Sequence, residues 1–319
     1  MRRVNDLAVF LAVAFGGAWL VALPLWLGGS GLATPALMPV AAAMMFTPSL
    51  GVLAVWLICR RGTPFGEWAG RTGLGLGPAR GRTFKVLAAT WAGTPLLVLA
   101  ALAVSALVGV VRLDLGGLSL FRAGLDVAGG APLPPETLAM AQLVSAVVVA
   151  PLLNAIPSLG EEWGWRGYLL PRLLGGAALD AAPRPTRIVW RAMLVSGVIW
   201  GLWHAPLTLL GYNYPNLGPW AALMFVGACV LLGAIFGWVR LRTGSVWPAV
   251  VGHGAFNASA GLILLVGDAA HPPNLALAGA TGVVGWAVLA VVVAVLRSPY
   301  RSRGQAAGDA ADAGSPVSG

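Results

Sequence analysis

The chain has 319 residues, of which 58% are hydrophobic and 10% are charged. Soluble domains carry roughly 25% charged residues, so this composition excludes an ordinary soluble protein and favours a polytopic membrane protein. The formal net charge of +9 does not indicate a nucleic-acid partner, because the basic residues lie mainly between the apolar stretches, as the positive-inside rule requires.

Apolar stretches recur along the whole chain, and a helix needs about 20 such residues to cross the bilayer core. Eight stretches are long enough, near residues 7–27, 36–59, 85–111, 140–170, 190–210, 220–239, 246–266 and 275–296. The first exceeds the roughly 7–15 apolar residues of a signal peptide, so we expect a retained helix. The predicted fold is an all-α polytopic membrane protein with about eight transmembrane helices.

The basic residues also predict the orientation. With the N-terminus in the cytoplasm, the 60–85 loop, the 172–191 segment and the C-terminal tail are cytoplasmic, and only Arg112 and Arg122 fall on the outer side. Both termini are therefore expected in the cytoplasm. The 60–85 loop, which carries Phe65 and Trp68 among arginines, suits either a segment on an anionic membrane surface or a simple basic connector.

Two connections have compositions of their own. The outer loop near 112–137 is rich in Gly and Pro, so we expect it to be irregular, with a helix restarting around Thr137. The tail 298–319 is rich in Gly, Ala, Asp and Ser and is expected to be disordered.

Ionisable residues inside a membrane cost roughly 2.5–3.5 kcal/mol each on insertion scales and are therefore functional candidates. The fourth stretch continues into GEEWGWRGYLL, which contains Glu161, Glu162 and Arg166. Glu162 and Arg166 are four residues apart on one helical face, so they can form an internal ion pair. Glu161 points elsewhere and has no partner nearby in the sequence.

Two of the three histidines, His204 and His253, also fall within predicted spans. His253 is followed four residues later by Asn257, so both side chains project from the same face of the seventh helix. At about 1.5 Å per helical residue, Glu161, His204 and His253 lie roughly 16, 20 and 16 Å from the nearest cytoplasmic arginine. Three helices therefore place polar groups in one layer, which predicts a single site.

Each of these residues also has a structural explanation when taken alone. A single intramembrane His or Asn is more often a packing hydrogen bonder than a catalyst, and Glu162 with Arg166 could be purely structural. The tryptophans near the polar groups are explained by bundle packing or interfacial anchoring. A carboxylate, two imidazoles and a carboxamide at one depth, however, suit hydrolysis better than packing.

The motifs GEEWGWRG, Trp200 to His204 and His253 to Asn257 resemble the ordered motifs EExxxR, FxxxH and HxxxN of one family. It is the CAAX-protease and bacteriocin-processing (CPBP, or Abi) family of intramembrane endopeptidases. The resemblance covers about residues 138–260, with Trp200 in place of the family's usual Phe. It divides the chain into N-terminal helices (1–137), a CPBP-like catalytic part (138–297) and the tail (298–319).

The resemblance implies a role for each polar residue. Glu161 and His204 would activate the attacking water, His253 and Asn257 would stabilise the oxyanion, and two supporting residues, Glu162 and Arg166, would organise the helix. No cofactor is certain, although Glu161, His204 and His253 could bind a divalent metal such as zinc. Other intramembrane proteases fit less well, because the sequence has no HExxH and no GxGD.

We therefore expect an integral membrane protein of a bacterial plasma membrane whose active site opens to the cytoplasm. Its expected partners are the bilayer and a peptide or protein substrate, either lipidated or not. A prenylated CAAX tail, a leader peptide and a signalling peptide all remain open as substrates. Two other functions also remain open, namely a non-catalytic immunity or scaffold protein and an ion-coupled transporter that uses the buried groups as a relay.

Overall fold

The computed structural model describes residues 5–130, 132–176 and 185–296. Helices dominate this part of the chain, and the β pairing found in it is one isolated bridge between Leu113 and Gly267. The all-α fold is therefore confirmed, and the protein is an integral membrane protein. The predicted disordered tail 298–319 lies outside the described residues.

Each of the eight predicted stretches contains helix. In chain order the helices are α1 (Asp6–Leu27), α2 (Leu37–Met45), α3 (Thr47–Cys59), α4 (Phe65–Arg71), α5 (Arg80–Leu107), α6 (Ser119–Val127), α7 (Pro135–Val147), α8 (Ala150–Glu162), η1 (Trp163–Leu169), α9 (Leu170–Leu173), α10 (Thr186–Trp203), α11 (Ala205–Thr208), α12 (Trp220–Thr243), α13 (Trp247–Ser259), α14 (Leu262–Val266) and α15 (Val283–Val295).

By length and composition, five of the described helical segments can cross a membrane, or six if the bent pair α7 and α8–α9 counts as one span. The stretch predicted at 275–296 is helical only over Val283–Val295, which is shorter than a bilayer requires at 1.5 Å per residue. The predicted number of eight spans and the cytoplasmic position of the termini stay predictions.

The fourth predicted span, 140–170, is broken rather than continuous. Its two parts, α7 and α8–α9, meet at an angle of 49°. Pro151 has no N–H to donate to the carbonyl of Val147, and the Trp91 indole supplies that bond instead, at 2.8 Å. The bend therefore begins where proline interrupts the helical hydrogen bonds, and α8 leaves it in a new direction toward the middle of the bundle.

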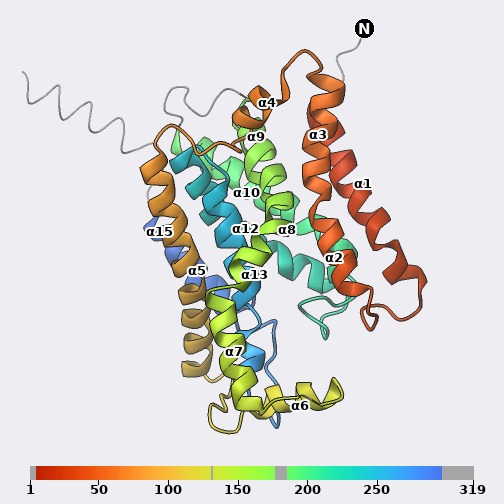
Figure 1. The fold of residues 1–319 in the computed structure, drawn as a ribbon, viewed down its shortest axis with the longest axis vertical. Coiled ribbons are helices and arrows are strands. Elements are labelled where there is room, and N and C mark those ends of the chain that lie inside the picture. The colour runs from red at the N-terminus through yellow and green to blue at the C-terminus, as the bar shows by residue number, and fades with distance from the viewer. Residues whose placement is uncertain (1–4, 131, 177–184, 297–319) are drawn as a thin grey trace, which may run out of the picture.

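The helices form two flanks and a centre (Figure 1). Packing contacts join α1 to α3 on one flank and α5 to α15 on the other, while α8, α10, α12 and α13 lie between them. Glycines permit the central contacts, since a Cβ on Gly201 would lie 2.6 Å from the Val226 Cα of α12. A Cβ on Gly254 of α13 would lie 2.5 Å from the Pro151 carbonyl of α8.

The loops gather at opposite ends of the bundle (Figure 1). The segment with α4 lies at the same end as α9, and α6 lies at the other end. The expectation of an irregular 112–137 loop was wrong for its middle, where α6 forms. The Asp114 carboxylate accepts hydrogen bonds from the backbone N–H groups of Gly117 and Ser119 and so stabilises the start of this helix. The next helix starts at Pro135, close to the predicted Thr137.

Candidate active site

The two adjacent glutamates lie at the end of α8, at its junction with the π-helix η1. Glu161, Glu162 and Arg166 are all buried, with at most 1% of each residue exposed. A π-helix is rare and is often found at functional positions. This one packs closely against α3, because a Cβ on Gly164 would lie 2.3 Å from the Pro48 side chain.

Glu162 contacts both other members of a buried ionic group, Arg166 and His253. Its Oε1 accepts a hydrogen bond from Arg166 Nη1 at 2.8 Å, so the ion pair expected from the four-residue spacing is confirmed. The same oxygen is 2.9 Å from Nδ1 of His253, and its Oε2 has no partner among the described residues. This bond to His253 joins α8 to α13 and was not foreseen, because the two residues are 91 positions apart.

Glu161 points away from that group and has a partner of its own. The indole Nε1 of Trp200, on α10, donates to Glu161 Oε2 at 2.5 Å. No hydrogen bond to Oε1 is found among the described residues. The sequence could not reveal the bond between Trp200 and Glu161, because the sequence predicts Trp200 only as a packing aromatic residue.

His204 terminates α10 and is held by the last turn of that helix. Its Nδ1 is 2.9 Å from the Trp200 carbonyl oxygen. Pro206 follows two residues later and cannot donate to the carbonyl of Leu202, so the chain turns from α10 into α11 at this point. The imidazole lies against the rings of Trp203 and Phe225, each with its centroid 4.7 Å away.

His253 lies on α13 among aromatic rings and is 4% exposed. It stacks on Phe236 at 5.8 Å between centroids and meets the edge of Trp200 at 5.4 Å. Asn257 projects from the same helix one turn later, is exposed, and makes no hydrogen bond to another described residue. Two glutamates, one arginine and two histidines are therefore brought together around Trp200, with the free carboxamide of Asn257 nearby in sequence on α13.

The hydrogen bonds define which imidazole nitrogen carries the proton. A carbonyl oxygen can only accept, so His204 Nδ1 must donate to Trp200, and its Nε2 is then an acceptor in the neutral ring. His253 Nδ1 faces a carboxylate oxygen already paired with Arg166 and therefore also donates. In its neutral form His253 cannot donate through Nε2, whereas its doubly protonated form can.

Glu161, His204 and His253 are the three residues predicted as possible ligands of a divalent metal. No three His, Cys, Asp or Glu side chains among the described residues are placed to hold a metal ion. Binding of a divalent metal by these three side chains stays a prediction.

Two comparisons with known proteins match the part of the chain that carries this site. A family model described as Type II CAAX prenyl endopeptidase Rce1-like matches residues 137–259. CAAX prenyl protease 2 of Methanococcus maripaludis is 28% identical over 113 residues, which cover 34% of this chain and 38% of that protein. The chain therefore spans well under half of that relative's length.

The matched segment contains Glu161, His204, His253 and Asn257, together with the supporting pair Glu162 and Arg166. It corresponds closely to the 138–260 range in which the three motifs were found. Residues 137–259 thus match the Rce1-like family of CAAX prenyl endopeptidases, and the resemblance predicted from the motifs is confirmed over that segment.

Proposed function

We propose that this chain is an intramembrane endopeptidase that hydrolyses a peptide bond of a membrane-associated peptide or protein. The observation that carries the proposal is that two adjacent buried glutamates have different partners. Glu162 is neutralised by Arg166 and bound to His253, whereas Glu161 accepts one indole N–H and keeps its other oxygen available. A buried carboxylate with a free oxygen beside two imidazoles is suited to general-base catalysis.

In the proposed reaction Glu161 takes a proton from a water molecule that His204 orients through its Nε2 acceptor. The water oxygen forms the new bond to the scissile carbonyl carbon, and the carbonyl oxygen becomes negatively charged. When the C–N bond breaks, Glu161 returns the proton to the leaving amine nitrogen. The net change is the addition of one water molecule across the peptide bond.

The developing oxyanion requires hydrogen-bond donors that are already in place. Asn257 can donate through its carboxamide N–H₂ because no other described group uses it. His253 can donate through Nε2 when it is doubly protonated, and Glu162, bound to its Nδ1, fixes the orientation of the ring. Glu162 therefore supports the reaction through His253 in addition to its ion pair with Arg166.

The names of the family model and of the relative supply a first substrate to test, namely a peptide ending in a prenylated CAAX sequence. We further propose that the site opens toward the cytoplasm, since α4, in the basic 60–85 segment, and α9, which includes Arg172, lie at the same end of the bundle (Figure 1). The expected bacterial plasma membrane location stays a prediction.

The test is cleavage of a farnesylated CAAX peptide by the protein in proteoliposomes. Glu161→Ala should abolish cleavage while the protein remains inserted and folded. An immunity or scaffold role would instead leave protection against a bacteriocin intact in Glu161→Ala. Ion-coupled uptake that is lost in Glu161→Gln, without peptide cleavage by the unchanged protein, would indicate transport and overturn the proposal.

A further inference from the structure

Trp200 contacts four ionisable residues of the site, although it is itself uncharged. Its indole Nε1 donates to Glu161 at 2.5 Å, and its backbone carbonyl accepts from His204 at 2.9 Å. The Arg166 guanidinium carbon lies 4.1 Å above its ring centroid, and the His253 ring meets it at 5.4 Å. With 3% of the residue exposed, these contacts are made away from bulk solvent.

The indole N–H distinguishes this residue from an aromatic side chain that only fills space. Phenylalanine has no polar hydrogen, so it could form a wall at this position but could not bind a carboxylate. A hydrogen bond to a charged acceptor is shorter and about twice as strong as a neutral one. Here the bond engages Oε2 of Glu161 and leaves Oε1 for another partner.

The Trp200 ring also uses different sides for the two glutamates. Arg166 is in contact with the Trp200 ring face while its Nη1 is bound to Glu162, and the ring edge carries the N–H that binds Glu161. The Arg166 guanidinium is thereby held at Glu162. Glu161 receives a neutral donor instead, which holds the carboxylate without pairing it with a full charge.

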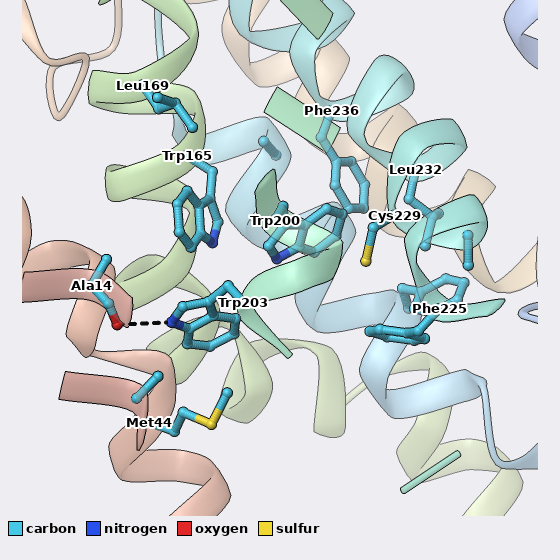
Figure 2. Packing of buried hydrophobic residues seen from close by; sticks show 14 of the residues in the cluster. Ala14, Met44, Trp165, Leu169, Trp200, Trp203, Phe225, Cys229, Leu232 and Phe236 are labelled. Carbon is cyan, nitrogen blue, oxygen red and sulfur yellow. Dashed lines mark hydrogen bonds between the residues drawn. The ribbon is translucent and has the colours of Figure 1, made fainter. Parts of the chain in front are cut away.

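Trp203 provides a natural comparison on the same helix. It is equally buried, at 1% exposed, but its Nε1 donates to the Ala14 carbonyl at 3.1 Å and to the Thr47 hydroxyl at 3.2 Å. Figure 2 shows Trp203 directed toward Ala14, whereas Trp200 lies on the side of Phe236 and Cys229. The two tryptophans thus differ in their N–H bonds, since the N–H of Trp203 joins α10 to α1 and the N–H of Trp200 binds the carboxylate of Glu161.

We propose that Trp200 is a positioning residue that fixes the Glu161 carboxylate through its indole N–H, so that Oε1 faces the water to be activated. This inference rests on the proposed role of Glu161 as the base. It adds a specific function to a position at which the sequence motif requires only an aromatic ring. Loss of the N–H would let the carboxylate rotate and would misplace the attacking water.

The test compares Trp200→Phe with the matched control Trp203→Phe in the full-length protein, using the farnesylated CAAX peptide. Trp200→Phe should lower kcat about tenfold or more, as for a lost hydrogen bond to a charged group, and leave KM within about twofold. Trp203→Phe keeps an aromatic ring against His204 and removes only an indole N–H whose hydrogen bonds go to Ala14 and Thr47, so kcat should stay within about twofold of the unchanged protein. Equal losses of kcat in the two variants, or an unchanged kcat in Trp200→Phe, would overturn the proposal.

A second measurement separates this inference from the proposed function. In the Glu161→Asp background the carboxylate is one methylene further from the indole, so Trp200→Phe should then change kcat by less than about twofold. Independently of any activity, the indole ¹H–¹⁵N resonance of Trp200 should move upfield in Glu161→Ala, while that of Trp203 stays in place. Cleavage that is identical with and without Glu161 would refute the role of Glu161 as the base and the positioning role with it, whereas an unmoved Trp200 resonance would refute the positioning role alone.

Discussion

The first helix and the helix that carries His253 are both apolar enough to cross a membrane, yet they differ in what surrounds them. In α1, 22% of the residues in the most apolar window are buried within the protein, whereas the share is 67% in the span formed by α13 and α14. Hydropathy therefore identifies both as membrane helices without distinguishing them. Burial separates a lipid-facing helix from one that is enclosed by other helices and can hold polar groups.

The ion pairs of the two regions also differ in how deeply they are buried. Asp6, at the start of α1, pairs with Arg60 at 2.7 Å and with Arg172 at 3.0 Å, and both arginine side chains are more than a third exposed. Glu162 and Arg166 pair where both side chains are at most 2% exposed. Exposed pairs are worth little, whereas a buried charge that loses its partner is strongly destabilising.

The largest effect should follow from removing one partner of the buried pair. Arg166→Met leaves Glu162 without its cation, and the free energy of unfolding should fall by about 3–5 kcal/mol. Arg60→Met should cost about 1 kcal/mol or less, because the buried Asp6 keeps Arg172 as a second partner. Reversible denaturation in mixed micelles measures both. Equal losses for the two variants would show that the two regions do not differ as described.

The second effect concerns turnover and leaves stability unchanged. Asn257→Ala should lower kcat by about 10²–10³, as for the loss of an oxyanion donor. The free energy of unfolding should stay within about 0.5 kcal/mol, because the side chain is exposed and has no hydrogen bond to another described residue. Steady-state cleavage and denaturation are compared on the same preparation, and near-normal turnover would remove Asn257 from the mechanism.

A smaller effect should follow from replacing a glycine by alanine in each of the two regions. A Cβ on Gly254 would lie 2.5 Å from the Pro151 carbonyl oxygen and 2.8 Å from the Ala155 nitrogen, so Gly254→Ala should cost about 1–3 kcal/mol. The matched change Gly16→Ala in α1 meets no atom within 4 Å and should alter stability by at most about 0.5 kcal/mol. If both glycines tolerated alanine equally, the close contact between α13 and α8 would not be a constraint.

The smallest effect lies outside the membrane, at the start of α6. Hydrogen bonds from the Ser119 side chain and from the backbone N–H groups of Gly117 and Ser119 lower the pKa of Asp114 from its ordinary value of 3.8. A lowered pKa in the folded protein means that this contribution is present above pH 3.8 and is lost as the pH falls through the lower folded value. Amide exchange at Gly117 and Ser119 should therefore be slow at neutral pH and faster in Asp114→Asn, with cleavage unaffected. Unchanged exchange rates in this variant would contradict the assignment.

Much of the fold and part of the site could be predicted from local sequence patterns. Apolar stretches marked the positions of the helices, and the four-residue spacing of Glu162 and Arg166 gave their ion pair, because both depend on residues close in the chain. The order of the three motifs likewise placed the residues that the family model matches. The helix α6 was missed, because Gly and Pro in its neighbourhood indicated a loop and the stabilising contacts of Asp114 are not visible in composition.

The contacts that organise the site depend on how distant helices pack. Glu162 meets His253 across 91 residues, and Trp200 meets Glu161 across 39. No periodicity in the sequence encodes either contact. The bend at Val147 was also missed, since Pro151 predicts an interrupted helix but does not predict the angle that the neighbouring helices impose.

The most direct measurement is the rate of farnesylated CAAX peptide cleavage by Glu161→Gln beside Glu136→Gln, a matched change at an exposed glutamate in the first turn of α7. Glutamine keeps the size of the side chain and can still accept the Trp200 indole N–H, but it cannot accept a proton from water. We expect cleavage to disappear in Glu161→Gln and to remain at its original rate in Glu136→Gln. Continued cleavage by folded Glu161→Gln would contradict the central claim that this carboxylate is the base.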